Sequence, residues 1–265
     1  MRLASLGAGF ESFMLLLFNN LLRDSIYGMV MRVSIGAFLS LVDAGTDISV
    51  LISYYSAGLY AQANILLAMI ASNMFVQCLT VLAIYAKKSW QRKLYEVMIT
   101  LTFLRPPIDA YRVSTNQIDD ENAVGVLAEM MYNKGAELGC ESIPGCILQC
   151  WVFLGNREQA GFFAALSIII SALTTGYSSA MIAFDMDVDL SNRKKQPKFY
   201  GYVPDDNSSR GRAFMLMTAI SAIHNLGLSV GCAMLAIADM DLLFTFAGGE
   251  IMVHLAVKLL RDDLR

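Results

Sequence analysis

The chain has 265 residues, of which 56% are hydrophobic and 16% are charged, and its mean hydropathy is +0.51. Soluble domains average roughly 45–50% apolar and about 25% charged residues, so both departures indicate a membrane protein. The formal net charge of −3, without any basic stripe, argues against nucleic-acid binding. Five cysteines without metal-ligand spacing and only two histidines argue against a metal centre, and we expect no cofactor.

The first apolar stretch, residues 8–22, is too short to cross a membrane, because as a helix it would rise only about 22 Å. Its large apolar side chains recur on one helical face. They are Phe10, Phe13, Leu17 and Leu21. This pattern predicts an N-terminal helix that lies in the membrane interface.

Six later segments approach or exceed the roughly 20 apolar residues that a helix needs to cross the hydrocarbon core. These segments are 33–56, 62–86, 131–154, 162–184, 213–237 and 242–259. No linker or second domain is visible between them. The sequence therefore predicts an all-α fold, a polytopic transmembrane helix bundle that forms one domain over residues 1–265.

Residues 94–113 are also apolar, but Arg105-Pro106-Pro107 stands in the middle of the stretch. Proline removes a backbone donor and disrupts a helix interior, so we expect the helix to break there. We interpret this stretch as a re-entrant or interfacial broken helix that returns to its own side of the membrane.

Lysine and arginine concentrate in the loops 87–93 and 188–212. Loops rich in these residues stay on the cytoplasmic side, so we expect both termini to be cytoplasmic as well. The three loops on the opposite side carry Arg157 as their single basic residue. They are 57–61, 155–161 and 238–241.

Two pairs of acidic residues fall inside the predicted spans. Asp43 and Asp47 are four residues apart in the first span, and Glu137 and Glu141 repeat that spacing in the third. Residues four apart share one face of a helix. Unpaired, the four carboxylates would cost roughly 10–14 kcal/mol on insertion scales, so they must be paired, protonated or in contact with water.

The depths of these acids suggest a path. Asp43 and Glu141 lie near the middle of their spans, Glu137 one turn toward the cytoplasm and Asp47 one turn toward the outside. If the two faces meet, the acids form a staircase along which a lipid headgroup or an ion can pass.

A purely structural alternative remains open, in which the acids pair with basic side chains and only hold the helices together. Arg105, Arg112 and Lys134 are the candidates for such pairs. Asp109 and Arg112 would form a salt bridge at the inner mouth of the path.

Other spans also carry ionisable groups at similar depth, namely His224 and Glu250. We expect His224 to be a core histidine rather than a proton relay. Pro144, just after Glu141, predicts a helix break. A broken helix beside an acid marks a binding site in some transporters, and an ordinary kink is the equal alternative.

Small residues recur at helical spacing in two places. The stripe of Ser167, Ser171, Thr175 and Ser179 predicts a close-packing seam, and Gly227 with Gly231 predicts a helix–helix contact. No phosphate loop, nucleophile elbow or metal motif is present, so we expect no enzymatic activity.

Two stretches resemble the XK-related family of membrane proteins. Leu41-Val42-Asp43-Ala44-Gly45-Thr46-Asp47 is similar to the family's LDxGTD block in its first span. The stretch from Glu137 to Pro144, followed by Ile147-Leu148-Gln149, is similar to its ExxxE(S/T)xPQ…LQ helix. The resemblance covers about residues 33–186. Gly145 stands where the family usually has glutamine, which is typical of a divergent branch such as algal or protist members.

The resemblance implies a helical membrane fold in which some members scramble phospholipids, with membrane lipids as partners. Carried over by position, the headgroup path would comprise Asp43, Asp47, Glu137 and Glu141. Some family members require activation or a partner chain, so a partner membrane chain or a homo-oligomer is a further expectation. An ion, proton or small-solute carrier or channel is the alternative function that the same acids allow.

Overall fold

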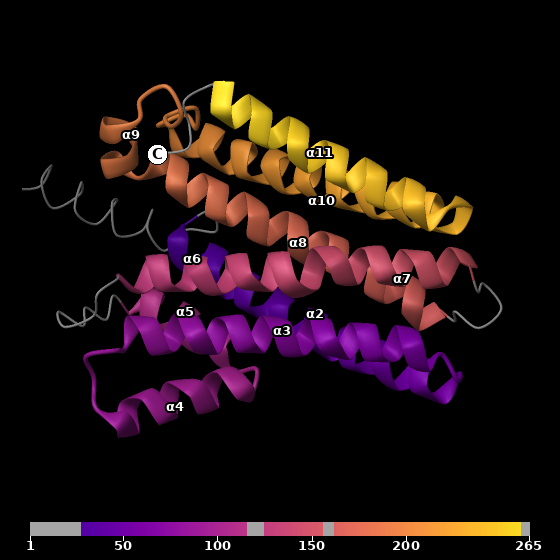
Figure 1. Cartoon of the computed structure of the whole chain (residues 1–265). Helices are drawn as coiled ribbons and strands as arrows, with labels where there is room; N and C mark the ends of the chain where they lie inside the picture. The colour runs from indigo at the N-terminus through magenta and orange to yellow at the C-terminus, as the bar shows by residue number, and fades with distance from the viewer. Residues whose placement is uncertain (1–27, 116–124, 156–161, 261–265) are drawn as a thin grey trace, which may run out of the picture.

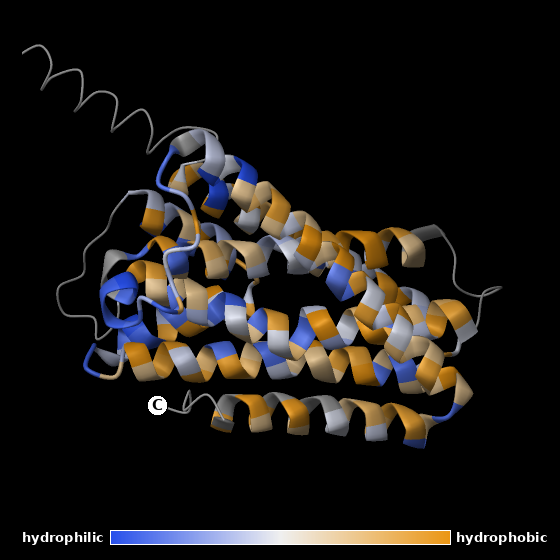
Figure 2. Ribbon diagram, turned by 90° about the horizontal axis from the view of Figure 1, so that it is seen from above, coloured by the Kyte–Doolittle hydropathy of each residue, from blue (hydrophilic) through white to orange (hydrophobic). Residues whose placement is uncertain are grey.

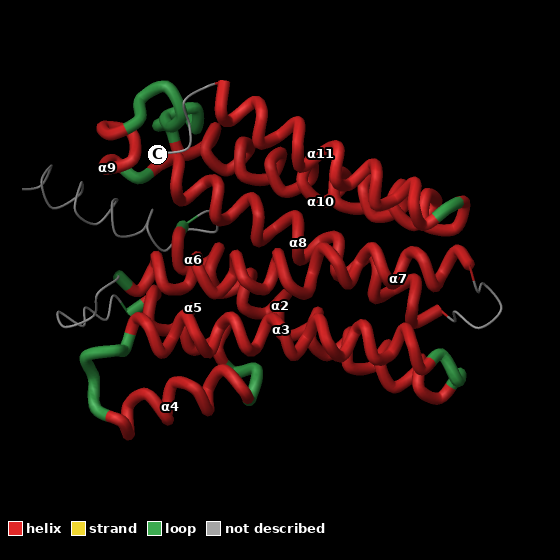
Figure 3. The backbone as a smooth tube through the Cα atoms, in the orientation of Figure 1, coloured by secondary structure: helices red, strands yellow, loops and turns green. Residues whose placement is uncertain are grey.

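The computed structural model describes residues 28–115, 125–155 and 162–260. Within these ranges the ordered elements are helices, and no strand occurs (Figure 3). The all-α fold is therefore confirmed. The interfacial helix expected at 8–22 lies outside the described residues.

Five of the described helices are long and apolar enough to cross a membrane. They are α2 (Met29–Ser56), α3 (Tyr60–Ile84), α6–η1–α7 (Val126–Gly155), α8 (Phe162–Val188) and α10 (Asn207–Ala238). The sixth expected span coincides with α11 (Met240–Leu260), which is 21 residues long; its crossing of the membrane stays a prediction.

The third span begins earlier than expected, at Val126 rather than 131. Its first turns carry Glu129, which lies before the expected start, and Lys134, which lies within the expected span. In the structure both side chains are buried, because Glu129 contacts Arg105 of α5 and Lys134 contacts Ser40 of α2.

The helices run side by side and alternate in direction along most of the bundle (Figure 1). α8 packs between α2 and α10, and α10 also contacts α7 and α11. The start of α2, the α3–α4 loop and the α8–α10 connection with α9 (Leu190–Lys195) lie at one end. The α2–α3 and α10–α11 turns lie at the other end. Both basic loops thus gather at the same end of the bundle.

Hydrophobic residues predominate along the helices, while the most hydrophilic colouring concentrates at the end that holds these loops (Figure 2). Large apolar side chains such as Phe38, Phe75 and Ile223 are exposed, whereas many carboxylates are buried. This distribution is the reverse of that in a soluble protein. It fits a molecule whose outer surface faces lipid.

The 94–113 stretch forms a helical hairpin of α4 (Trp90–Leu101) and α5 (Arg105–Ser114) that returns to its own end of the bundle (Figure 1). The expected role of the prolines is wrong. The chain turns at 102–104, before them, and Pro106 and Pro107 occupy the first turn of α5. A missing N–H costs little there and the fixed φ favours the helix start.

The expected break at Pro144 takes the form of a π-helical turn, η1 (Leu138–Ser142), between α6 (Val126–Glu137) and α7 (Ile143–Gly155). The span continues through it. Such a turn inserts one residue into the helix, so all later side chains are rotated about the helix axis relative to those before it.

The serine and threonine stripe of α8 lies in a close-packing seam, as expected. Ser167, Ser171 and Thr175 are buried, and Gly176 lies directly against Ala222 of α10. The Gly227 and Gly231 prediction is wrong for this chain. Both are exposed, and a Cβ at either would meet nothing within 4 Å.

We expect Gly176→Ala to destabilise the protein by about 1–3 kcal/mol, because overpacking a tight contact forces the helices apart. An added Cβ would lie 2.5 Å from the Ala222 backbone nitrogen. Gly227→Ala, in open space, is the matched control and should be neutral or slightly stabilising. Thermal unfolding in detergent measures both, and equal stabilities would contradict the seam.

Candidate functional site

The four acids predicted from the sequence come together in the structure. Asp43 and Asp47 on α2 face Glu137 and Glu141 on α6 and η1, and all four side chains are buried. We call these four residues the acidic cluster. The condition for a shared path, that Asp43 and Glu141 lie on the same side of the bundle, is met, since both line one cleft.

Three polar contacts join α2 to the third span in parallel register. Ser40 Oγ donates to Glu137 at 2.7 Å. Ser142 Oγ lies 3.5 Å from Asp43 Oδ2, and Gln149 Nε2 donates to Asp47 Oδ1 at 2.7 Å. Each step moves about one turn along α2 and between one and two turns along the third span.

The π turn explains this register. In a regular helix Gln149 would point about 120° away from Glu137, since each residue turns by about 100°. One inserted residue reduces that offset to about 20°, which directs Gln149 and Ser142 toward α2. Glu141, inside the π turn, is instead directed toward α3, where it accepts a hydrogen bond from Asn73. The spacing of the acids alone does not reveal this rotation.

Lys134 is the one described cation in hydrogen-bond contact with the acidic cluster. Its Nζ contacts Ser40 Oγ and lies 3.0 Å from Glu137 Oε2. One ammonium therefore faces four carboxylates. If all were ionised, three negative charges would remain without a described counter-charge, at a depth where each is costly.

Three members of the cluster, Asp43, Glu137 and Glu141, line a narrow cleft between α2, α3, the third span and the tip of the α4–α5 hairpin, and Asp47 is not among its lining residues. The space inside it for water-sized molecules is about 30 Å³, enough for ordered water. Oδ1 of Asp43 is buried and has no hydrogen-bond partner in the structure. One of the residues that line the cleft thus has a carboxylate oxygen without a described hydrogen-bond partner.

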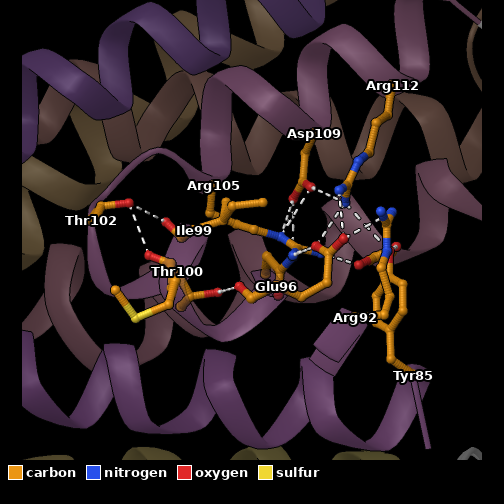
Figure 4. A network of polar contacts seen from close by, with 12 residues as sticks. Tyr85, Arg92, Glu96, Ile99, Thr100, Thr102, Arg105, Asp109 and Arg112 are labelled. Carbon is orange, nitrogen blue, oxygen red and sulfur yellow. Dashed lines mark hydrogen bonds and ion pairs between the residues drawn. The ribbon is translucent and has the colours of Figure 1, made fainter. Parts of the chain in front are cut away.

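Arg105 and Arg112 do not pair with the acidic cluster, which corrects that expectation. They belong to a separate buried network, the arginine cage, shown in part in Figure 4. Its members are Glu96 on α4, Arg105, Asp109 and Arg112 on α5, and Glu129 on α6.

Arg105 is the centre of the cage. Its Nη1 donates to Glu96 at 2.7 Å, its Nε lies 3.0 Å from Asp109, and its Nη2 contacts Glu129. Arg112 donates to both oxygens of Glu96, at 2.6 and 3.0 Å. Every guanidinium nitrogen of Arg105 therefore already contacts a carboxylate.

The expected Asp109–Arg112 pair is a minor contact, with 3.9 Å between the charged atoms. Asp109 instead accepts from Asn133 at 3.0 Å as well as from Arg105. Glu96 and Glu129 were missed from the sequence. Two features of the sequence could have indicated them. Arg92 and Glu96 have the i,i+4 spacing of a helical ion pair and lie 3.0 Å apart, and Glu129 is an acid near the start of the third span.

Two further predicted residues lie elsewhere. His224 is exposed on α10, so its assignment to the core is wrong. The side chain of Glu250 lies outside the described residues. Among the side chains that the structure describes, no group of three His, Cys, Asp or Glu residues is arranged to hold a metal ion.

The chemistry of the site is that of a water-sized, acid-lined cleft in the middle of a membrane bundle. It offers carboxyl oxygens to anything that enters, and negative charge to the extent that these acids are ionised. No family model, curated protein or solved structure matches the chain. Five apolar helices that enclose buried carboxylates are those of an integral, multi-pass membrane protein.

Proposed function

We propose that this protein moves phospholipids between the two leaflets of its membrane, with the acidic cluster as the path for the headgroup. The observation that carries the proposal is where the cleft opens. A lipid scramblase needs a polar path that lipid can reach from the side, and we take the mouth of this cleft to be at its partly exposed lining residues, which stand beside large apolar side chains of the outer surface.

The mouth is formed by partly buried side chains of α2, α3 and the hairpin, namely Ala44, Met74, Phe103 and Pro106. Beside them along the chain are large apolar side chains that are exposed. They are Leu41, Phe75 and Leu104. In a membrane these side chains contact acyl chains, so a headgroup enters from within the bilayer rather than from the water on either side.

The polar path covers the most costly part of the crossing. From Ser40 to Ala44, the α2 residues that line the cleft, it extends about 6 Å along α2, about a fifth of the 30 Å hydrocarbon core. This is shorter than the staircase expected from the depths alone. It lies near the middle of the span, where a headgroup is farthest from water and a polar lining lowers the barrier most.

The cleft must widen for transport. A space of about 30 Å³ accommodates water but not a phospholipid headgroup. The structure is therefore that of a closed state in this proposal, and opening requires the hairpin tip to separate from α2 and α3. Activation or a partner chain would act on this step.

The basic loops are cytoplasmic in this proposal, together with both termini. Arg193, Lys194 and Lys195 of α9 lie at the end that also holds the α3–α4 loop, and the positive-inside tendency assigns that end to the cytoplasm. A second copy or a partner chain would find the exposed glycines of α10, Gly227 and Gly231, available for close approach.

Carriage of a proton or small cation is the second candidate. It is favoured by the unpartnered Oδ1 of Asp43 in a cleft that at present admits only water-sized species. Unlike scrambling, it requires no lateral entry of lipid.

We expect purified protein in liposomes to bring fluorescent inner-leaflet lipid to the outer leaflet, where dithionite bleaches it. Asp43→Asn/Glu141→Gln should abolish most of this transfer, because it removes the two carboxylates at the centre of the path. The measurement is the fraction of fluorescence bleached with time, compared with that of empty liposomes.

The matched control is Asp205→Asn/Asp241→Asn, which removes two exposed carboxylates outside the bundle core. Arg193 and Arg210 lower the pKa of Asp205, but exposed ion pairs of this kind contribute little to stability. The control should scramble like the wild type. A folded wild-type protein that bleaches no faster than empty liposomes would refute lipid transport.

A further inference from the structure

The acidic cluster contains four carboxyl groups and contacts one ammonium, that of Lys134, and this imbalance bears on the headgroups it accepts. We infer, on the basis of the proposed lipid transport, that this site selects phospholipids whose headgroups carry an ammonium, as phosphoethanolamine and phosphocholine do. It discriminates against anionic headgroups without one, such as phosphoglycerol. The inference rests on charge, on hydrogen-bond supply and on the state of the nearby arginine.

Charge is the first argument. Four buried carboxylates face one ammonium, Lys134, which already contacts Ser40 and Glu137. An ammonium group that enters the cleft supplies part of the missing positive charge. A headgroup with only a phosphate adds another negative charge to a poorly screened site, where like charges repel strongly.

The amide donors beside the acidic cluster are already used in hydrogen bonds within the protein. The amide of Asn73 donates to Glu141, and that of Gln77 donates to Asn73 at 2.8 Å. Asp43 Oδ1 is a buried acceptor without a described partner, and its residue lines the cleft, whereas the hydroxyl of Ser171 is a buried donor that also lacks one. A ligand that brings N–H donors satisfies the carboxylate acceptor, whereas a phosphate brings more acceptors.

The third argument is that the nearest arginine is not available for a phosphate. Arg105 lines the cleft, and guanidinium groups are the usual partners of phosphate in proteins. Its three nitrogens, however, are engaged by Glu96, Asp109 and Glu129. A bare anion therefore finds no described cation that is free of carboxylates.

The charge of the cluster, its hydrogen-bonding groups and the engaged Arg105 together predict an order of transport rates. Ethanolamine headgroups, which supply both charge and donors, should pass at least as fast as choline headgroups, which supply charge alone. Phosphoglycerol headgroups should pass at least about tenfold more slowly than either, a difference that corresponds to about 1.4 kcal/mol.

The test uses acyl-chain-labelled lipids with the three headgroups, each as a trace in liposomes of one uncharged composition. The wild-type protein should scramble the ethanolamine and choline lipids faster than the glycerol lipid. In Asp43→Asn and in Asp47→Asn, tested singly, the ratio of ethanolamine to glycerol rates should fall, because each change removes a negative charge and adds donors. The ratio is informative even where both rates decrease.

Equal rates for all three headgroups in active wild-type protein would overturn this inference and leave lipid transport in place. A selectivity that is unchanged in both single variants would overturn the assignment to the acidic cluster. Absence of transfer for every headgroup would instead refute the proposed function itself. Asp205→Asn, outside the cluster, should keep the wild-type ratio.

Discussion

Replacement of Arg105 by glutamine is expected to destabilise the protein by about 3–5 kcal/mol, the cost of breaking a buried charge network by removal of one partner. The side chain is fully buried and contacts Glu96, Asp109 and Glu129. Without it these carboxylates, which come from three different helices, face one another with Arg112 as their main remaining buried cation. Denaturant or thermal unfolding in detergent measures the effect.

The control is Arg210→Gln, which removes an arginine from a pair with the exposed Asp205 and should change stability by no more than about 1 kcal/mol. Addition of Glu129→Gln to Arg105→Gln should recover part of the loss, because it removes one of the unpaired charges. Such coupling between neighbours is what a double-mutant cycle detects. A loss for Arg105→Gln as small as that for Arg210→Gln would contradict the cage.

Shortening Phe103 is expected to accelerate lipid transport. Phe103 lies at the tip of the α4–α5 hairpin, lines the cleft and packs against the apolar cluster that includes Val50 and Leu66. Loss of the ring removes about 1–2 kcal/mol of apolar packing that holds the mouth closed. A change of that size in the opening equilibrium raises the open population by about 5–30-fold at most. The liposome bleaching rate measures it.

The backbone of Phe103 makes the choice of substitution informative. Its φ is +58°, in the left-handed region that costs a non-glycine residue about 1–2 kcal/mol. Phe103→Gly should therefore be more stable than Phe103→Ala, although both open the mouth. Leu104→Ala, at the exposed neighbouring position, should leave transport unchanged. Slower transport in both Phe103 variants, in folded protein, would contradict a closing role for the ring.

The fold was largely predictable, because hydropathy and the membrane thickness determine where helices span. The expected and observed spans agree within a few residues at most ends. The start of the third span was misplaced, since Glu129 resembles a surface residue until its buried partner is known. The hairpin was predicted too, but proline was given the role of breaking a helix that it in fact begins.

The site was predictable in part. A spacing of four residues places Asp43 with Asp47, and Glu137 with Glu141, and the parallel packing of their helices brings the pairs together. The contact of Gln149 with Asp47 depends on the π turn, whose one-residue phase shift leaves no periodic signal in the sequence.

The arginine cage was missed for a different reason. Its members lie on three helices, and their sequence separations are set by the path of the hairpin. The sequence alone therefore allows Arg105 to pair with any acid that lies nearby. Only the packing of α4 and α5 shows that Glu96 and Glu129 occupy it, and so leave the acidic cluster with Lys134 alone.

The most direct test of the account measures lipid transfer and ion flux in the same liposomes. Bleaching of labelled lipid reports transfer, and an enclosed pH-sensitive dye, under an imposed potassium gradient with valinomycin, reports proton entry. If the acidic cluster is a lipid path, we expect fast lipid transfer by the wild-type protein that is lost in Asp43→Asn/Glu141→Gln. Proton entry that depends on these acids, in liposomes whose lipid is not transferred, would contradict it and assign the acidic cluster to ion transport.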